Sequence, residues 1–124
     1  MATILVVDDS AMSRKSLRRI LEPAGHRVIE AEDGIAALER FFVDKPDLVL
    51  LDLTMSGMYG LEVLTKLREM DGGVRVIVAS ADIQSSTRGM AEEAGATLFI
   101  NKPFSVDQVL NAVNSALGGS DGVD

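Results

Sequence analysis

The sequence predicts one α/β domain of (βα)5 type: a doubly wound, five-stranded parallel sheet with helices on both of its faces. Three observations support this fold class: five short apolar segments, amphipathic helical patterns between them, and turn residues that end those patterns. The chain has 124 residues, so we expect a single folded domain over residues 1–117. Residues 118–124 are small, polar and acidic, and we expect a disordered tail there.

The strand candidates are short apolar runs rich in leucine or β-branched residues. They occupy residues 4–7, 28–31, 48–51, 74–79 and 97–100, bounded by Gly, Asp, Asn or Lys. Runs of this length with little polar alternation indicate strands that are buried on both faces.

The helical segments show apolar residues spaced to form one face. The clearest sets are Leu17, Ile20, Leu21 and Ala24, and then Val106, Val109, Leu110, Val113 and Leu117. Helices are expected to end at residues 22–25, 45–46 and 71–73 and at Gly95, where Gly or Pro interrupts the pattern. In such a fold every strand directs its carboxyl end to the same edge of the sheet.

Composition excludes several functional classes. Cysteine is absent, which excludes disulfides, thiolate metal sites and cysteine nucleophiles. The formal net charge of −7 argues against non-specific nucleic-acid binding. No apolar run approaches the roughly 20 residues that span a membrane, and the first residues lack the basic start of a secretory signal, so we expect a cytoplasmic protein without membrane contact.

Three carboxylates follow strands that should be neighbours. Asp8 and Asp9 end the first strand and Asp52 ends the third. The strand order 2-1-3-4-5, taken from known doubly wound folds, makes these strands adjacent at the point where ligands bind. An oxygen-only set favours Mg²⁺, with Asp9 and Asp52 as direct ligands. Taken alone, Asp8 and Asp9 are better explained by a capped turn into the first helix.

A hydroxyl and an ammonium group should reach the same edge. Ser80 follows the fourth strand and Lys102 the fifth. Together with a metal they can neutralise a phosphoryl group, and a carboxylate can accept that group as an acyl phosphate. Individually, Ser80 is better explained by helix capping and Lys102 by an exposed charge at a strand end.

The chain resembles the receiver domains of two-component response regulators, in the flavodoxin-like fold, over residues 3–117. The matching motifs are Val7-Asp8-Asp9-Ser10, residues 47–52 followed by Met55, Gly57 and Gly60, Ser80-Ala81, residues 94–96, and Lys102-Pro103-Phe104. The resemblance implies that Asp52 accepts a phosphoryl group from a sensor histidine kinase or a histidine phosphotransfer protein. Such a domain catalyses its own phosphorylation and dephosphorylation and is a signalling switch rather than an enzyme.

The resemblance also implies roles for the other site residues. Asp9 would bind Mg²⁺ directly, Asp8 through water, and Thr54 through its carbonyl, while Ser80 and Lys102 would contact the phosphoryl oxygens. Ser80 and Phe99 would form a switch that reshapes the surface of the fourth helix, fifth strand and fifth helix. Thr54 and Asp82 would tune dephosphorylation.

The expected downstream partner is a protein, as in chemotaxis regulators, and not DNA. We expect a monomer or weak dimer. Ser56 and Tyr59 depart from the family pattern, which has Pro after the loop methionine and Asp or Asn before the glycine. Without that proline the loop after Asp52 is less constrained.

Several features have two explanations from the sequence. Arg14, Lys15, Arg18 and Arg19 form a basic face on the first helix, explained by solvation or by kinase docking. Phe99 is either a core residue or the switch aromatic, and His26 is interpreted as a turn residue without a companion ligand.

Three other functions fit the sequence less well. A haloacid-dehalogenase-like phosphatase would need Asp where Thr54 stands. A flavodoxin-like cofactor module would need a phosphate-binding loop where Asp8 and Asp9 stand. A receiver-like scaffold that takes no phosphate is disfavoured by the intact acceptor, metal and lysine positions.

Overall fold

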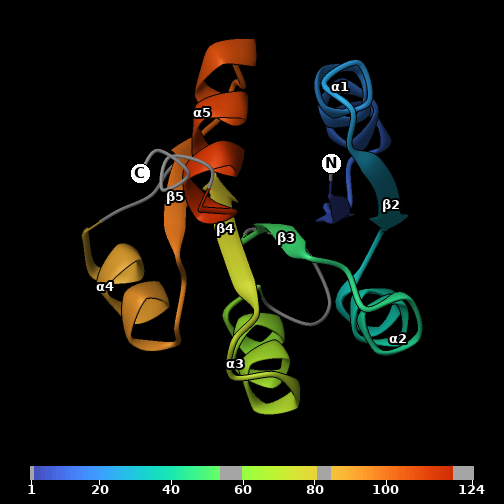
Figure 1. Cartoon of the computed structure of the whole chain (residues 1–124). Coiled ribbons are helices and arrows are strands. Elements are labelled where there is room, and N and C mark those ends of the chain that lie inside the picture. Colours follow the sequence, from blue (N-terminus) through green and yellow to red (C-terminus); the bar gives the residue numbers. More distant parts are fainter. Residues whose placement is uncertain (1, 54–59, 81–84, 119–124) are drawn as a thin grey trace.

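The computed structural model describes residues 2–53, 60–80 and 85–118, with five strands and five helices among them (Figure 1). The strands are β1 (Thr3–Val7), β2 (Arg27–Ala31), β3 (Leu48–Asp52), β4 (Arg75–Ser80) and β5 (Leu98–Asn101). The helices are α1 (Ala11–Leu21), α2 (Gly34–Asp44), α3 (Gly60–Met70), α4 (Ser85–Glu93) and α5 (Val106–Ala116).

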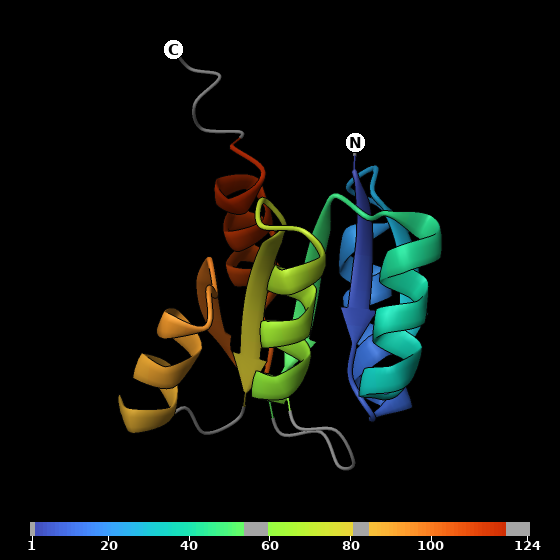
Figure 2. The ribbon, with the colours of Figure 1, turned by 90° about the horizontal axis from the view of Figure 1, so that it is seen from below.

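The strands form one parallel sheet in the order β2-β1-β3-β4-β5, which confirms the predicted fold class. Figure 2 shows the strand arrows pointing to the same edge of the sheet. The register places Val7 of β1 beside Leu51 of β3, so the residues that follow these two strands emerge side by side. The side chains that were predicted to meet at the carboxyl edge of the sheet can therefore lie close together.

The sheet separates two apolar cores, because successive strand residues point to opposite faces. One core contains Leu5, Val49 and Val76 from the strands and is covered by α2, α3 and α4 (Figure 1). The other contains Ile4, Leu50 and Ile77 and is covered by α1 and α5. Burial on both faces explains why the strand sequences lack alternation with polar residues.

Several strand and helix boundaries differ from the prediction by one or a few residues, and three of these differences have clear local reasons. Ala24 belongs to a turn after α1, where its N–H donates to the carbonyl of Leu21. Val74 also lies in a turn, because its N–H bonds the carbonyl of Asp71 and its own carbonyl accepts from Arg68. Thr97 accepts the Val76 N–H with its hydroxyl oxygen rather than its backbone, so β5 begins one residue later than predicted.

Among the described helices, none combines the length and the apolar character that crossing a membrane requires.

Candidate functional site

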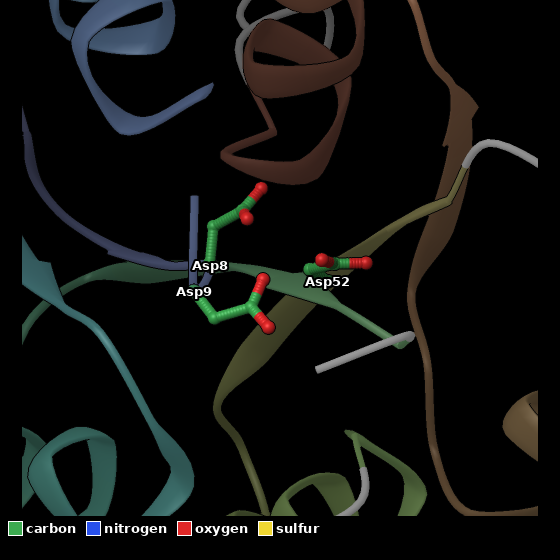
Figure 3. A group of neighbouring side chains, drawn as sticks. All are labelled: Asp8, Asp9 and Asp52. Atoms are coloured by element: carbon green, nitrogen blue, oxygen red, sulfur yellow. The ribbon is translucent and has the colours of Figure 1, made fainter. Parts of the chain in front are cut away.

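The carboxyl edge of the sheet gathers the three aspartates that the sequence singled out. Asp8 and Asp9 directly follow β1, and Asp52 is the last residue of β3 (Figure 3). Each offers a carboxylate oxygen that lies within 4.8 Å of the others. Asp8 and Asp52 are buried and Asp9 is exposed. The cluster therefore has a buried floor and one carboxylate accessible from solvent.

Asp8 is held by four hydrogen bonds. Its N–H donates to the carbonyl of Ala31 (3.1 Å), and its carbonyl accepts from Nη1 of Arg14 (2.6 Å). One carboxylate oxygen accepts the N–H of Ser10 (2.9 Å) and the other accepts Nζ of Lys102 (2.8 Å). With the residue only 2% exposed, these bonds fix both the backbone and the carboxylate.

The turn after β1 shows that the simpler explanation of Asp8 is also correct in part. The N-cap of α1 is Ser10, whose hydroxyl oxygen accepts the N–H of Ser13 at 3.2 Å. Asp8 supports this turn through its bond from Ser10. A capping role and a place in the carboxylate cluster are therefore compatible.

Lys102 supplies the positive charge of the site. Its Nζ lies 2.8 Å from Oδ2 of Asp8 and 3.4 Å from Oδ2 of Asp52. Burial alone would lower the pKa of Lys102, but the hydrogen bond to Asp8 and the charges of Asp52 and Asp8 raise it above its ordinary value. The ammonium is thus charged at neutral pH and partly offsets the repulsion among the carboxylates.

Backbone contacts join the ends of β3, β4 and β5. The N–H of Leu53 donates to the carbonyl of Ala79 at 3.2 Å, and that of Lys102 donates to the carbonyl of Ser80 at 3.0 Å. Ser80 is 1% exposed. These bonds place the Ser80 backbone between the strand that ends in Asp52 and the residue that carries the ammonium.

Gly60, the first residue of α3, lies against the backbone that follows the Asp52 strand. A Cβ atom added at Gly60 would come within 2.5 Å of Leu53 Cα and 2.8 Å of the Asp52 carbonyl oxygen. Only glycine fits this approach without displacing the strand end. Gly60 was among the residues that carry the resemblance to receiver domains, but the reason that glycine is required there follows only from the close approach of α3 to β3.

Phe99 of β5 pairs with Val78 of β4, two residues before Ser80. Its ring is half-buried, packs against the core beneath α4, and lies under the guanidinium of Arg88. Both a core role and a switch role remain compatible with this position.

Some residues singled out from the sequence lie outside the described residues, so the hypotheses for them stay predictions. They are Thr54, Asp82, Ser56, Tyr59 and residues 119–124.

The basic face of α1 divides into two pairs of residues. Arg14 and Arg18 both donate to the carboxylate of Glu30 on β2 at 2.8 Å, whereas Lys15 and Arg19 are exposed. Solvation alone therefore does not account for Arg14 and Arg18, which pair with Glu30. The contact from Arg14 to the Asp8 carbonyl was missed, because sequence spacing does not show which arginine reaches the site.

His26 has a structural partner that the sequence did not reveal. Its Nδ1 accepts the N–H of Ala2 at 3.1 Å, which joins the start of β1 to the residue before β2. The interpretation of His26 as a turn residue was thus incomplete, because its ring also joins two segments of the chain.

The donor set of the cluster suits a divalent cation with a preference for oxygen. Three carboxylates converge without a thiolate or imidazole in the described cluster, and Mg²⁺ binds through one or two carboxylates while it retains waters. A parallel sheet with such a cluster and a lysine at its switch point is the arrangement of a phosphoacceptor signalling domain.

The chain belongs to the response regulator receiver domain family, whose model matches residues 4–114. It is 43% identical to the chemotaxis protein CheY of Bacillus subtilis over 115 residues, covering 92% of this chain and 96% of that protein. It is 34% identical to sporulation initiation phosphotransferase F of the same organism, covering 92% of each.

Solved structures agree with this assignment. The Vibrio cholerae chemotaxis protein CheY4 matches with a TM-score of 0.90 and 26% identity, covering 94% of this chain and 98% of that one. The chain is thus a CheY-like receiver domain of a two-component system, a class defined by phosphoacceptor signalling.

Proposed function

We propose that this receiver domain accepts a phosphoryl group on Asp52, in the presence of Mg²⁺, from a histidine kinase or a histidine phosphotransfer protein. The observation that carries the proposal is the convergence of three carboxylates within 4.8 Å, with Lys102 Nζ 3.4 Å from Asp52. In our proposal Asp52 is the acceptor, because it ends β3, the central strand of the sheet, and because the resemblance to receiver domains implies this role.

The same contacts support a division of roles toward the metal. Both carboxylate oxygens of Asp8 already accept hydrogen bonds, which favours contact through water. Asp9 is exposed and Asp52 belongs to the same cluster, so these two are the direct ligands in our proposal, with the Thr54 carbonyl as a third. Bound Mg²⁺ would neutralise the phosphoryl oxygens and the carboxylates together.

The transfer step needs little chemistry from the protein beyond position and charge. A carboxylate oxygen of Asp52 forms a P–O bond as the P–N bond to the donor imidazole breaks. The electron pair of that bond goes to the imidazole nitrogen, which takes up a proton. In our proposal Lys102 and the Ser80 hydroxyl stabilise the phosphoryl oxygens, as their places at the ends of β5 and β4 favour.

The signal would leave the site through Ser80 and Phe99. A phosphoryl group offers strong acceptors that draw the Ser80 hydroxyl toward it, and the ring of Phe99 would turn into the space released. This movement would change the surface of α4, β5 and α5 for a protein partner that prefers one state. The resemblance to chemotaxis proteins supports a partner of that pathway rather than DNA.

The proposal also covers the lifetime of the phosphorylated state, the extent of the receiver, and where and in what form the protein acts. Thr54 and Asp82, each two residues beyond a site residue, would control the access of water and so the lifetime of the phosphorylated state. Residues 1–117 form the receiver and 118–124 a tail in this proposal, and the protein acts in the cytoplasm as a monomer or weak dimer.

The test is phosphorylation by a small donor. Incubation with phosphoramidate should add one phosphoryl group, measured by intact mass, only when Mg²⁺ is present. Asp52→Asn is the matched control and should remain unmodified. Equal modification of Asp52→Asn, or modification undiminished by EDTA, would contradict the proposal.

A further inference from the structure

Arg14 connects the backbone of the carboxylate cluster to β2. Its Nη1 donates to the carbonyl of Asp8 at 2.6 Å, and its Nε donates to Oε1 of Glu30 at 2.8 Å. The side chain is only 14% exposed. One guanidinium therefore spans α1, the loop after β1 and β2, and its planar fork gives both bonds a defined direction.

The bond to the Asp8 carbonyl acts on the next residue along the chain. The carbonyl of Asp8 and the N–H and Cα of Asp9 lie in one planar peptide unit. A donor that fixes this carbonyl therefore fixes the plane from which the Asp9 side chain departs. Three further bonds hold Asp8, and Asp9 follows it at the exposed rim of the cluster.

Glu30 holds Arg14 in this position and offsets its charge. The two oxygens of Glu30 accept from Arg14 and from Arg18, each at 2.8 Å. Arg18 also donates to Glu22 and to the carbonyl of Val28, and within the described residues it bonds no atom of the loop after β1. Two arginines therefore share one carboxylate, and of these two it is Arg14 that is bonded to the carboxylate cluster.

We infer that Arg14 is a positioning residue for the metal ligand Asp9: by holding the Asp8 carbonyl, it orients the Asp8–Asp9 peptide for divalent-cation binding. This inference rests on the proposed function, in which Asp9 binds Mg²⁺. Partners that orient metal ligands typically change metal affinity by roughly 10- to 100-fold when they are removed.

Loss of the Arg14 side chain should change the Mg²⁺ affinity in the direction opposite to that expected from its charge alone. Arg14 carries a positive charge near three carboxylates, so its removal as a charge alone would strengthen the attraction for Mg²⁺. Removal of its positioning bond would weaken Mg²⁺ binding instead. The direction of the change therefore distinguishes positioning from charge.

The experiment compares Arg14→Ala with Arg18→Ala, which removes the same charge and a bond to the same Glu30. Calorimetric titration of the folded proteins with Mg²⁺ should show affinity about tenfold weaker for Arg14→Ala and within about twofold of wild type for Arg18→Ala. Unchanged or tighter binding by Arg14→Ala, or equal weakening in both variants, would overturn the inference. Arg14→Lys replaces Arg14→Ala if the latter does not fold, since a single ammonium keeps the charge but loses the fork.

A second readout needs no metal. In ¹H–¹⁵N spectra of the metal-free proteins, the amide of Asp9 should shift in the Arg14 variant and stay in place in Arg18→Ala. An undisturbed Asp9 amide in the Arg14 variant would contradict positioning. If the wild type itself failed to bind Mg²⁺, the proposed function would fall, while the Asp9 amide would still report on the positioning.

Discussion

The guanidinium of Arg88 in α4 lies over the ring of Phe99 in β5, with 4.6 Å between Cζ and the ring centroid. The ring is half-buried, and Arg88 is exposed on the surface of the helix. A cation above an aromatic face is attracted by the ring quadrupole, by about 0.5–1 kcal/mol at exposed sites. In the proposed switch, Phe99 leaves this position as it turns inward, so the contact stabilises the unphosphorylated state.

Replacing Arg88 with alanine should favour the activated state. The loss of about 0.5–1 kcal/mol from the resting state corresponds to about a two- to fivefold change in its equilibrium with the active one. We expect Arg88→Ala to bind beryllofluoride with Mg²⁺ more tightly by up to this factor, measured by NMR titration.

Arg27→Ala is the matched control, because it removes an exposed arginine at the start of β2, at the opposite edge of the sheet from β5. It should leave the beryllofluoride affinity unchanged. Equal affinities for Arg88→Ala and Arg27→Ala would show that the contact does not bias the switch.

Lys102→Met should destabilise the metal-free protein. The substitution leaves the buried carboxylate of Asp8 without its ammonium partner. Breaking a buried ion pair costs roughly 3–5 kcal/mol, and partial exposure of the Lys102 side chain reduces this to about 2–3 kcal/mol. Urea unfolding in EDTA measures the difference.

Mg²⁺ should restore part of the stability that Lys102→Met loses. Three carboxylates without an ammonium attract a cation more strongly, and binding to the folded state stabilises it. The increase in Tm on addition of Mg²⁺ should therefore be larger for Lys102→Met than for wild type. Lys15→Met, which removes an exposed lysine of α1, should respond as wild type does. A smaller increase for Lys102→Met would contradict the arrangement of the site.

The fold was predictable because local patterns and global topology agree. The uninterrupted apolar run of residues 48–51 suits a strand covered on both faces, and α1 and α3 supply such cover on opposite faces. The boundaries were less predictable. The hydroxyl of Thr97 accepts the N–H of Val76, 21 residues earlier, and Arg68 bonds the carbonyl of Val74 in the following turn. Neither side-chain contact is specified by the apolar pattern.

Residues of the site were predictable where they directly end a strand. Asp8, Asp9 and Asp52 needed only the topology to be brought together. The supporting contacts were not predictable in this way. Arg14 and Arg18 lie one helical turn apart on the same face of α1, and Arg14 is the nearer of the two to Asp8 along the chain. That its guanidinium bonds the Asp8 carbonyl while it also bonds Glu30 depends on how α1 packs against β2. The requirement for glycine at position 60 likewise depends on how closely the start of α3 approaches the end of β3.

Stability should fall as the pH decreases below neutrality, because of His26. Burial lowers the pKa of His26 from its ordinary value of 6.5, and its Nδ1 must stay unprotonated to accept the Ala2 N–H. The unfolded chain therefore takes up a proton at higher pH than the folded protein. This contribution is complete above about pH 6.5 and is lost as the pH falls through the folded pKa.

His26→Asn isolates this contribution, since an amide oxygen can accept the same N–H without titrating. Urea unfolding from pH 7.5 to 5 should show a steeper loss of stability for wild type than for His26→Asn. Parallel curves for the two proteins would exclude His26 as the source.

Gly60→Ala should impair both folding and phosphorylation, because the added Cβ would lie 2.5 Å from Leu53 Cα and 2.8 Å from the Asp52 carbonyl oxygen. Backbone atoms cannot yield as a flexible side chain does, so α3 or the end of β3 must shift, at about 1–3 kcal/mol. Gly89→Ala is the matched control. Nothing lies within 4 Å of its added Cβ, and alanine inside α4 should stabilise by about 0.5–1 kcal/mol. Thermal unfolding and the rate of modification by phosphoramidate would measure both effects. Equal stability and an equal rate for Gly60→Ala and wild type would show that the strand end carrying Asp52 tolerates a displacement of α3.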